Sequence, residues 1–337
     1  MSPLVSIVVP AYNAAKRIES TLLSITAQDY RDIEIIVVDD ASSDGTGDVA
    51  KNVLTRSGRV FRILKHDSNM GESAARNTGL QFVSGDYVVF FDADDMADPN
   101  FVSVLIEAIT ENDSDAAFCG YRNRFEDTGE ERTVPIRLDP SRRHSAEELI
   151  VMHIFKRIRP SICTTIFKTS FLKTAGLEFT VGCHVGADTE FLTKALSRCG
   201  SINFSTGCHY IYVQHEDMVS RTMRQTPDKI LRRYTYITEA VCRTARYLAK
   251  HAESPKVRGI AMNFMLADGF IRTLNVAAMR NDETEFYLTL YAPEARRALT
   301  ASLRYIFQKP EVFLKASSLL IVPWTYFRIR SKSWSKS

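Results

Sequence analysis

The chain has 337 residues, of which 45% are hydrophobic and 25% charged, as in folded proteins with a sizeable core. The N-terminal MSPLVSIVVP lacks the pattern of a secretory signal, and no run of about 18 apolar residues suggests a membrane span. The six cysteines have no metal-ligand spacing, so we expect reduced thiols and a cytoplasmic protein.

Charge divides the chain unequally. Residues 1–220 carry 22 Lys and Arg against 31 Asp and Glu, a net charge of −9, whereas residues 221–337 carry 21 against 9, a net charge of +12. A basic C-terminal third fits an anionic surface, either nucleic acid or lipid headgroups.

The first hundred residues alternate strand-like runs with helical patterns. The runs are VSIVVP (5–10), EIIVVD (34–39), FRILKH (61–66) and DYVVFF (86–91). Asn13 is expected to cap a helix that carries Ile18, Leu22 and Ile25, and 74–83 is a second helix. This alternation predicts a parallel sheet covered on both faces, with ligands bound at the carboxyl ends of the strands.

Polar and acidic clusters follow three of these four strands. They are PAYN (10–13), DDASSDGT (39–46) and DADD (92–95). An aspartate in such a loop is also a common helix cap, so a single residue indicates little. Three clusters at equivalent strand ends predict one site on convergent loops.

The rest of the chain is less regular. Strand-like runs recur at 116–121, 161–167 and 209–214, and the pattern is helical from Asp228 onward. We predict an α/β catalytic domain over residues 1–222 with a mostly parallel central sheet flanked by helices. Residues 223–337 are predicted to form a helical, basic C-terminal extension that contacts a membrane interface or an acceptor.

Four ordered stretches resemble the family 2 glycosyltransferases, nucleotide-sugar enzymes with the type A fold. They are VSIVVPAYN, EIIVVDDASSDGT, NMGESAARNTGL and GDYVVFFDADD. The resemblance is close over residues 4–105 and looser to about residue 220. It implies an inverting transferase that moves a hexose or N-acetylhexosamine from a nucleotide sugar, most simply a UDP-sugar, to a hydroxyl of a glycan or lipid-linked glycan in polysaccharide biosynthesis.

The same resemblance implies a metal site. Asp92 and Asp94, with Ala93 between them, would form the D-x-D motif that holds Mg²⁺ or Mn²⁺ on the donor diphosphate. Such cations prefer carboxylate oxygens together with substrate phosphates, and they neutralise charge on the leaving group. Asp95 has two possible roles: it binds the metal as Asp92 and Asp94 do, or it caps the segment that follows it.

Further residues acquire nucleotide-binding roles from the resemblance. Asp39 would accept a hydrogen bond from the base and Asp40 would lie close to the nucleotide. Arg76 would face the nucleotide, although an arginine fork pairs equally well with surface acids. The base would be lined by Pro10, Ala11 and Tyr12.

Inversion requires a base that accepts the proton of the acceptor hydroxyl. In HVGADTEFLTKAL, Asp188 matches the Asp of the family's Glu-Asp pair, whereas Ala187 replaces the Glu. Asp188 also fits a plain helix N-cap, and Glu190 is the reserve candidate for the base. His215, in YIYVQHEDMVSRT, either approaches the metal or diphosphate or is a solvated surface residue.

Aromatic and basic residues meet near the C-terminus. Aromatic rings beside cations favour a membrane interface, here the cytoplasmic face of the inner membrane, although a docking helix with a basic tail fits equally. No nucleic-acid module is recognisable. The aromatic residues are Trp324, Tyr326 and Phe327, and the cations are Arg328, Arg330, Lys332 and Lys336.

Two other functions stay open. A D-x-D phosphohydrolase usually carries this motif after the first strand, whereas here it follows the fourth. A non-catalytic sugar-nucleotide binder is compatible with Ala187. A dinucleotide oxidoreductase is disfavoured, because no G-x-G-x-x-G follows the first strand.

Overall fold

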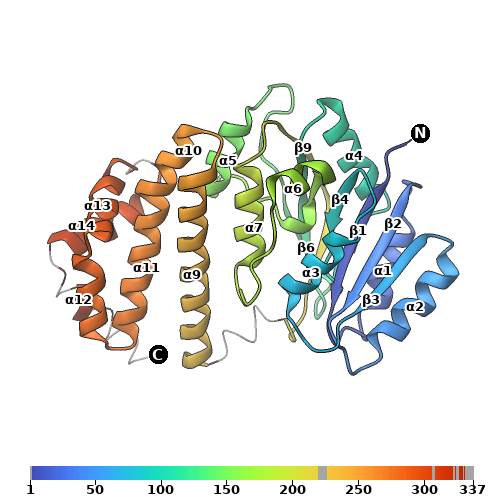
Figure 1. Cartoon of the computed structure of the whole chain (residues 1–337), viewed down its shortest axis with the longest axis horizontal. Helices are drawn as coiled ribbons and strands as arrows, with labels where there is room; N and C mark the ends of the chain where they lie inside the picture. The colour runs from blue at the N-terminus through green and yellow to red at the C-terminus, as the bar shows by residue number, and fades with distance from the viewer. Residues whose placement is uncertain are drawn as a thin grey trace. The chain divides into compact units, whose positions relative to one another are not determined.

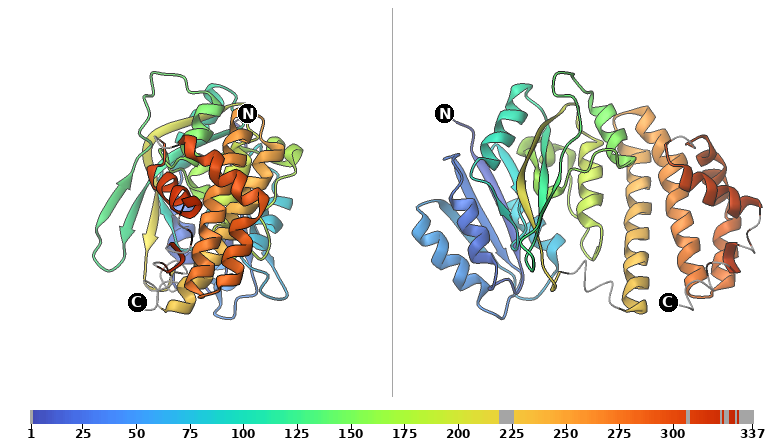
Figure 2. Two further views of the ribbon diagram at one scale, coloured as in Figure 1. Left: turned by 90° about the vertical axis from the view of Figure 1, so that its left-hand side faces the viewer. Right: turned by 180° about the vertical axis from the view of Figure 1, so that it is seen from behind.

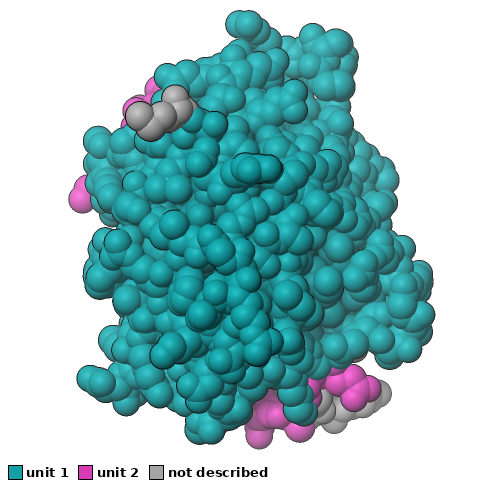
Figure 3. Space-filling model, turned by 90° about the vertical axis from the view of Figure 1, so that its right-hand side faces the viewer, with its two compact units in different colours: residues 1–215 teal, residues 216–337 magenta. Residues whose placement is uncertain are grey.

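The computed structural model describes residues 2–218, 226–305, 308–321, 323, 326–328 and 330. The chain forms two compact units, residues 1–215 (unit 1) and residues 216–337 (unit 2), coloured separately in Figure 3. The predicted domain boundary near residue 222 falls within 219–225, outside the described residues. All six cysteines are free thiols.

Unit 1 is built on a mixed sheet with the order β3-β2-β1-β4-β8-β6-β9-β5, in which β7 pairs with β6. Strands β3, β2, β1 and β4 are parallel neighbours, as predicted, whereas β8 runs antiparallel to β4 and β6. The strands are β1 Val5–Ala11, β2 Ile33–Asp39, β3 Val60–Lys65, β4 Tyr87–Phe90, β5 Met96–Ala97, β6 Ala116–Phe125, β7 Glu131–Val134, β8 Thr165–Lys168 and β9 Ile202–Gln214.

Helices cover both faces of this sheet. Strands β1, β2 and β4 are buried along their whole length, which explains their nearly continuous apolar sequences. Helices α1 (Ile18–Thr26) and α2 (Thr46–Ser57) lie on one face, and α3 (Glu72–Gln81) lies on the other (Figures 1 and 2). The remaining helices of unit 1 are α4 Phe101–Glu111, α5 Ala146–Ile154, the short 3₁₀ turn η1 Ile162–Thr164, α6 Thr169–Ala175 and α7 Ala187–Leu196.

Helix α3 packs unusually close to the sheet. A Cβ atom on Gly79 would clash with Cγ1 of Val8 on β1, so only glycine permits this approach. The helix begins at the edge where β1, β2 and β4 end, and it places Arg76, three residues before Gly79, close to that edge.

The predicted cap of the first helix is wrong. Helix α1 begins at Ile18, with Arg17 at the cap position. Asn13 instead adopts a left-handed backbone conformation, with φ of 48°, and its Oδ1 accepts a hydrogen bond from Ser43 N at 3.0 Å. Asparagine tolerates this conformation, so the residue serves a turn rather than the helix.

The described residues of unit 2 from Pro227 onward form helices joined by short loops, as predicted from Asp228 onward. Helix α9 begins with a Thr226 cap and a proline in its first turn, a common helix start. Short loops and a π turn join the helices. They are α9 Pro227–His251, α10 Pro255–Ile260, the π turn η2 Ala261–Met265, α11 Leu266–Met279, α12 Glu283–Tyr291, α13 Pro293–Ser302, the 3₁₀ turn η3 Leu303–Tyr305 and α14 Pro310–Ile321.

Part of the predicted membrane patch is packed into unit 2. Phe327 is 5% exposed, and its ring centroid lies 5.0 Å from that of Phe286. The Tyr326 hydroxyl donates to Oδ1 of Asn275 at 2.9 Å. These two aromatics therefore serve as docking contacts. Of the predicted cations, Arg328 is exposed and the Arg330 guanidinium lies 5.9 Å from the Tyr326 ring centroid. Trp324, Lys332 and Lys336 lie outside the described residues. Within the described part of the chain, no helix is both long and apolar enough to cross a membrane.

Candidate active site

The loops after β1 and β2 lock together at the sheet edge. Ala11 pairs with Asp39, and the main-chain N–H of Asp40 donates to the Ala11 carbonyl at 2.8 Å. The N–H of Asn13 donates to the Ser42 hydroxyl at 3.0 Å. The predicted convergence of the first two polar clusters is therefore present in the structure.

The proposed base-binding residues lie here with very different exposures. Ala11 is only 3% exposed and Pro10 is buried, whereas Tyr12 is 53% exposed and presents a ring to solvent. Oδ1 of Asp39 accepts a hydrogen bond from Ser42 N at 2.9 Å. Of this group, Tyr12 is the side chain that a bound base can reach without rearrangement.

Asp40 joins two loops through its carboxylate. It accepts from Met70 N at 2.9 Å and Gly71 N at 2.8 Å, and it lies 2.6 Å from Nδ1 of His66. The side chain is 2% exposed. Asp40 thus fixes the loop that opens α3 and lies behind the site rather than on its surface. His66, which sequence reasoning missed, completes this link through Thr78.

Arg76 is the centre of the site. Its side chain is fully buried, yet it bonds to three carboxylates from different parts of unit 1. Nη2 lies 2.7 Å from Oδ1 of Asp92 and 2.7 Å from Oε1 of Glu72, and Nη1 donates to Oδ1 of Asp188. These carboxylates raise the pKa of Arg76 well above its usual range, although desolvation opposes them. This permanently charged fork holds the acids together.

Aromatic packing brings α7 to Arg76. The rings of Phe179 and Phe191 stack at 3.9 Å, and both contact Phe90 at the end of β4. The Arg76 guanidinium lies 5.2 Å from the Phe179 ring centroid. Asn77 exchanges two hydrogen bonds with the Phe179 backbone, at 2.8 and 2.9 Å. Sequence reasoning missed this clamp, although Asn77 directly follows the arginine in the motif.

The acidic cluster after β4 divides into exposed and buried members. The side chains of Asp92 and Asp94 are 21% and 36% exposed, and Asp94 Oδ2 lies 2.8 Å from Nε2 of His215. Asp95 is fully buried and accepts from the Tyr210 hydroxyl at 2.6 Å and Val213 N at 2.8 Å. Asp95 is thus an anchor to β9 and neither a helix cap nor a solvent-facing ligand.

Burial changes the acidity of these groups. Desolvation raises the pKa of Asp92, and Asp188 and Asp94 add to this effect although Arg76 opposes it. Desolvation, reinforced by Asp92 and Asp94, raises the pKa of Asp95 well above its usual range. These shifts favour the protonated forms of Asp92 and Asp95, because more acids are gathered here than Arg76 alone balances.

The oxygens present suit a hard divalent cation. Asp92 and Asp94 offer partly exposed carboxylates, and Nδ1 of His215 is buried without a hydrogen-bond partner among the described residues. No group of three or more His, Cys, Asp or Glu side chains in that part of the chain forms a ready-made metal centre. This donor set fits an ion that needs substrate oxygens to complete its shell.

The two candidate bases occupy different environments. Asp188 is the second residue of α7, its side chain is 45% exposed, and Gly186 occupies the cap position, so the N-cap alternative is wrong. Ala187 offers no carboxylate beside it. Glu190, the reserve candidate, is 2% exposed and binds Lys194 at 2.5 Å and the Thr180 hydroxyl at 2.8 Å. Asp188 is therefore the carboxylate that an acceptor can approach.

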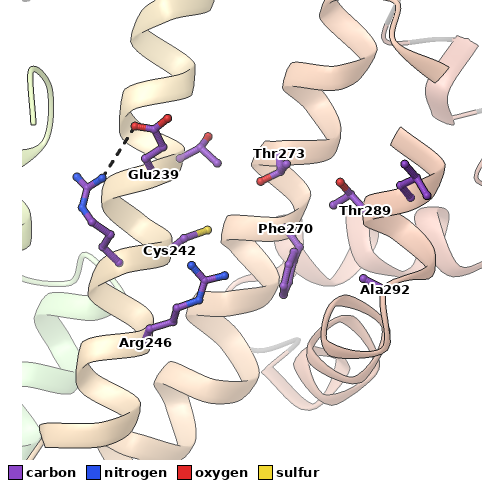
Figure 4. A pocket seen from close by; sticks show the side chains of 10 residues that line it. Glu239, Cys242, Arg246, Phe270, Thr273, Thr289 and Ala292 are labelled. Atoms are coloured by element: carbon purple, nitrogen blue, oxygen red, sulfur yellow. Dashed lines mark ion pairs between the residues drawn. The ribbon is translucent and has the colours of Figure 1, made fainter. Parts of the chain in front are cut away.

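A separate cavity lies in unit 2, between α9, α11 and α12. It has a volume of about 550 Å³, and its lining includes Cys242, Arg246, Phe270 and Thr289 (Figure 4). Its walls are mostly apolar and hold one ion pair, Glu239 with Arg243 at 3.9 Å. The carboxylates around Arg76 lie in unit 1, so this cavity is distinct from the candidate active site.

Comparisons with known proteins show what the chain is similar to. Residues 6–170 match the family model "Glycosyl transferase family 2". The chain is 35% identical to Glycosyltransferase GlyG of Streptococcus pneumoniae over 129 residues, which are 38% of this chain and 42% of that protein. The match thus spans about two fifths of this relative's length.

Solved structures share the fold. The chain resembles S. aureus TarS 1-349 in complex with UDP-GlcNAc, with a TM-score of 0.63 and 21% identity over 97% of this chain and 88% of that one. It also resembles the mannosyltransferase PcManGT from Pyrobaculum calidifontis in complex with GDP-Man and Mn²⁺, with a TM-score of 0.55 and 20% identity over 99% and 85%. Residues 6–170 are therefore similar to glycosyl transferase family 2, and the chain shares the type A fold of these two solved structures.

Proposed function

We propose that the chain is a metal-dependent, inverting transferase that moves a hexose or N-acetylhexosamine from a UDP-sugar to a hydroxyl of a glycan acceptor. The observation that carries this proposal is the buried fork of Arg76. It joins Asp92, a D-x-D carboxylate, to Asp188, a carboxylate that solvent reaches. One rigid group thus couples the donor side of the site to the acceptor side.

Asp92 and Asp94 would hold Mn²⁺ or Mg²⁺, and His215 would orient Asp94 through its hydrogen bond or contribute Nδ1 as a ligand. A bound divalent ion neutralises negative charge that develops on the departing nucleoside diphosphate. The mannosyltransferase with the same fold was solved with GDP-Man and Mn²⁺, which supports a divalent metal as a cofactor of this chain.

The remaining residues supply binding and proton transfer. Tyr12 would stack on the base. Asp39 would accept from a base N–H and Arg76 would contact the diphosphate once the loops that bury both side chains rearrange around the nucleotide. Pro10, Ala11, Asp40 and Ala93 would shape the backbone around the nucleotide. Asp188 would accept the proton of the attacking hydroxyl, because its carboxylate is exposed and oriented by Arg76.

We further propose a division of labour along the chain. Residues 1–222 would form the catalytic domain, and residues 223–337 would bind the acceptor or contact the membrane. The net charge of +12 from residue 221 onward supports an anionic surface as the partner. This implies a lipid-linked glycan acceptor and a peripheral location at the cytoplasmic face of the inner membrane.

The decisive experiment measures nucleotide binding and transfer together. Calorimetry with UDP and Mn²⁺ should give binding that chelation or Asp94→Ala abolishes while the protein stays folded. A panel of nucleotide sugars should then show transfer or slow hydrolysis of one donor. Undiminished UDP affinity after both changes would disprove the metal assignment. Tight binding with no turnover of any donor would favour a non-catalytic binder.

A further inference from the structure

Glu72 is a carboxylate of the site that has no part in the proposed mechanism. It opens α3 directly after Gly71, a position with φ of 87°, and its Oε1 lies 2.7 Å from Nη2 of Arg76. Its side chain is 57% exposed, against 21% for Asp92 and 45% for Asp188. Of the three acids on the fork, Glu72 is the most open to an incoming molecule.

A structural role does not account for this placement. Asp92 and Asp188 already exceed the single positive charge of Arg76, so a third carboxylate adds uncompensated negative charge. The i,i+4 ion pair with Arg76 adds little on the Glu72 side, because water competes for that exposed carboxylate. The charges around Arg76 disfavour a third carboxylate, so the presence of Glu72 there is more consistent with a functional role than with a structural one.

The surrounding acids add to this cost. Arg76 lowers the pKa of Glu72, whereas desolvation and the charges of Asp188, Asp92 and Asp94 raise it above its usual value. More than half of the side chain is open to water, which screens part of the repulsion. A hydrogen-bond donor brought by a ligand would relieve it further.

The fork also indicates which ligand reaches Glu72. Glu72 shares Nη2 with Asp92, a D-x-D carboxylate, whereas Asp188 takes Nη1. In an in-line displacement the leaving diphosphate and the base lie on opposite sides of the sugar carbon. Glu72 therefore lies on the donor side, where a sugar ring presents hydroxyl groups. Hydroxyls donate strong hydrogen bonds to carboxylates.

We propose that Glu72 accepts a hydrogen bond from a hydroxyl of the transferred sugar, and so selects the donor by its sugar rather than by its nucleotide. This role rests on the proposed function. It makes Glu72 a specificity-determining residue, distinct from the base Asp188 and from the candidate metal ligands.

The test separates sugar contacts from nucleotide contacts. Calorimetry with Mn²⁺ uses UDP, UDP-glucose and UDP-N-acetylglucosamine, and the wild type identifies the sugar that adds affinity over UDP. Glu72→Gln should leave UDP affinity within about twofold and weaken the preferred UDP-sugar by about 10- to 100-fold, the cost of losing one charged hydrogen bond. Glu72→Asp keeps the charge but withdraws it by one methylene, so an intermediate loss is expected. Glu107→Gln, an exposed change on α4, serves as the control.

Each outcome is informative. If UDP and UDP-sugar affinities fall together, Glu72 acts only by positioning Arg76 and the proposal is wrong. If neither falls in Glu72→Gln or in Glu72→Asp, no sugar hydroxyl contacts this carboxylate and the proposal is also wrong. If the wild type binds UDP but neither UDP-sugar more tightly, no hydroxyl of the sugar adds affinity and the proposal is wrong. If it binds none of the three probes, the proposed function itself fails and this role fails with it. Thermal unfolding checks each variant, and Glu72→Asp decides the question if Glu72→Gln does not fold.

Discussion

The two units of this protein use charge in opposite ways. Unit 1 carries 22 Lys and Arg against 29 Asp and Glu, and it gathers its functional charges around one fully buried guanidinium, that of Arg76. Unit 2 carries 21 against 11, and cations such as Arg246, Lys250 and Arg297 lie exposed on its helices. Buried charges interact strongly with a specific partner. Solvated charges interact weakly with their neighbours, and their contributions add up.

The difference follows from architecture. In unit 1 parallel strands deliver polar loops from distant parts of the chain to one edge, where they can share a partner. In unit 2 each helix buries an apolar stripe and leaves its polar face in solvent. Single substitutions in the acidic unit 1 should therefore have large effects on activity or stability. Binding by the basic unit 2 should instead depend on the salt concentration.

The largest effect is expected at the buried arginine. Arg76→Met leaves Asp92, Asp188 and Glu72 without their shared cation. Transfer should fall by about 10³-fold or more, because both the diphosphate contact and the orientation of Asp188 are lost. The free energy of unfolding should fall by about 3 kcal/mol, the lower end for a broken buried pair since these acids are partly solvated. Transfer assays and urea unfolding measure the two changes.

Two further variants of arginine sharpen this result. Arg62→Met, an exposed change on β3, should alter neither quantity. Arg76→Lys keeps the charge but loses the fork, so it should resemble Arg76→Met in transfer. Wild-type transfer by Arg76→Lys would show that the site needs only a positive charge.

The second effect concerns the exposed and buried acids of α7. Asp188→Asn removes the proton acceptor and keeps the size of the side chain, so transfer should fall by about 10² or more while UDP affinity stays unchanged. Glu190→Gln should leave transfer near the wild-type rate and lower stability, because Glu190 holds Lys194 and Thr180 inside unit 1. The reverse pattern would make Glu190 the base.

The third effect tests unit 2. Neutralising Arg328, Arg330, Lys332 and Lys336 to Gln should weaken sedimentation with anionic vesicles by at least about tenfold, because each cation contributes about 1 kcal/mol near an anionic leaflet. Binding of the wild type should weaken as salt rises, since the Debye length is about 10 Å at 0.1 M. This variant is preferable to deleting residues 313–337, because Phe327 and Leu319 are packed within unit 2.

UDP binding provides the matched control for that variant, because its proposed ligands all belong to unit 1. Unchanged sedimentation of the neutralised protein, or no sedimentation of the wild type, would remove the case for a membrane partner. The C-terminal segment would then be a packing element only.

The smallest effect is a pH dependence inside unit 1. Desolvation, assisted by Lys156, lowers the pKa of His153 to about 4, and Nε2 of His153 lies 3.0 Å from the Thr193 hydroxyl. The unfolded chain binds a proton near pH 6.5, so His153 favours the folded state fully above that pH and loses this contribution down to about pH 4. The free energy of unfolding should fall by about 1 kcal/mol from pH 7 to pH 5.5 on this account.

Urea unfolding at the two pH values measures the change, and His153→Gln should reduce it. His184→Gln, at an exposed histidine, should not. An equal pH slope in wild type and His153→Gln would show that other groups cause the acid loss of stability.

Much of unit 1 could be predicted from the sequence. Apolar periodicity and chain order, which are local properties, predict the first four strands and their parallel pairing. They also predict that the polar loops lie at one edge of the sheet. Asp92, Asp94, Arg76 and Asp188 could be named because the stretches around them resemble motifs of the family 2 glycosyltransferases. The helical character of unit 2 was equally visible in its pattern.

Pairings between residues far apart in the chain became known only from the folded arrangement. Arg76 and Asp188 are 112 positions apart, and Asp94 and His215 are 121 apart, so no local pattern pairs them. The same reason explains why Asn13, predicted as a helix cap, joined the loop after β2. It also explains why the sequence left two roles open for Tyr326 and Phe327, which pack within unit 2. The type of a residue determines which interactions its side chain can make. Its burial and its partners in the folded protein determine which of these interactions it makes. Glu72 and Glu190 carry identical carboxylates, and only packing left the first open to solvent beside Arg76 and enclosed the second with Lys194.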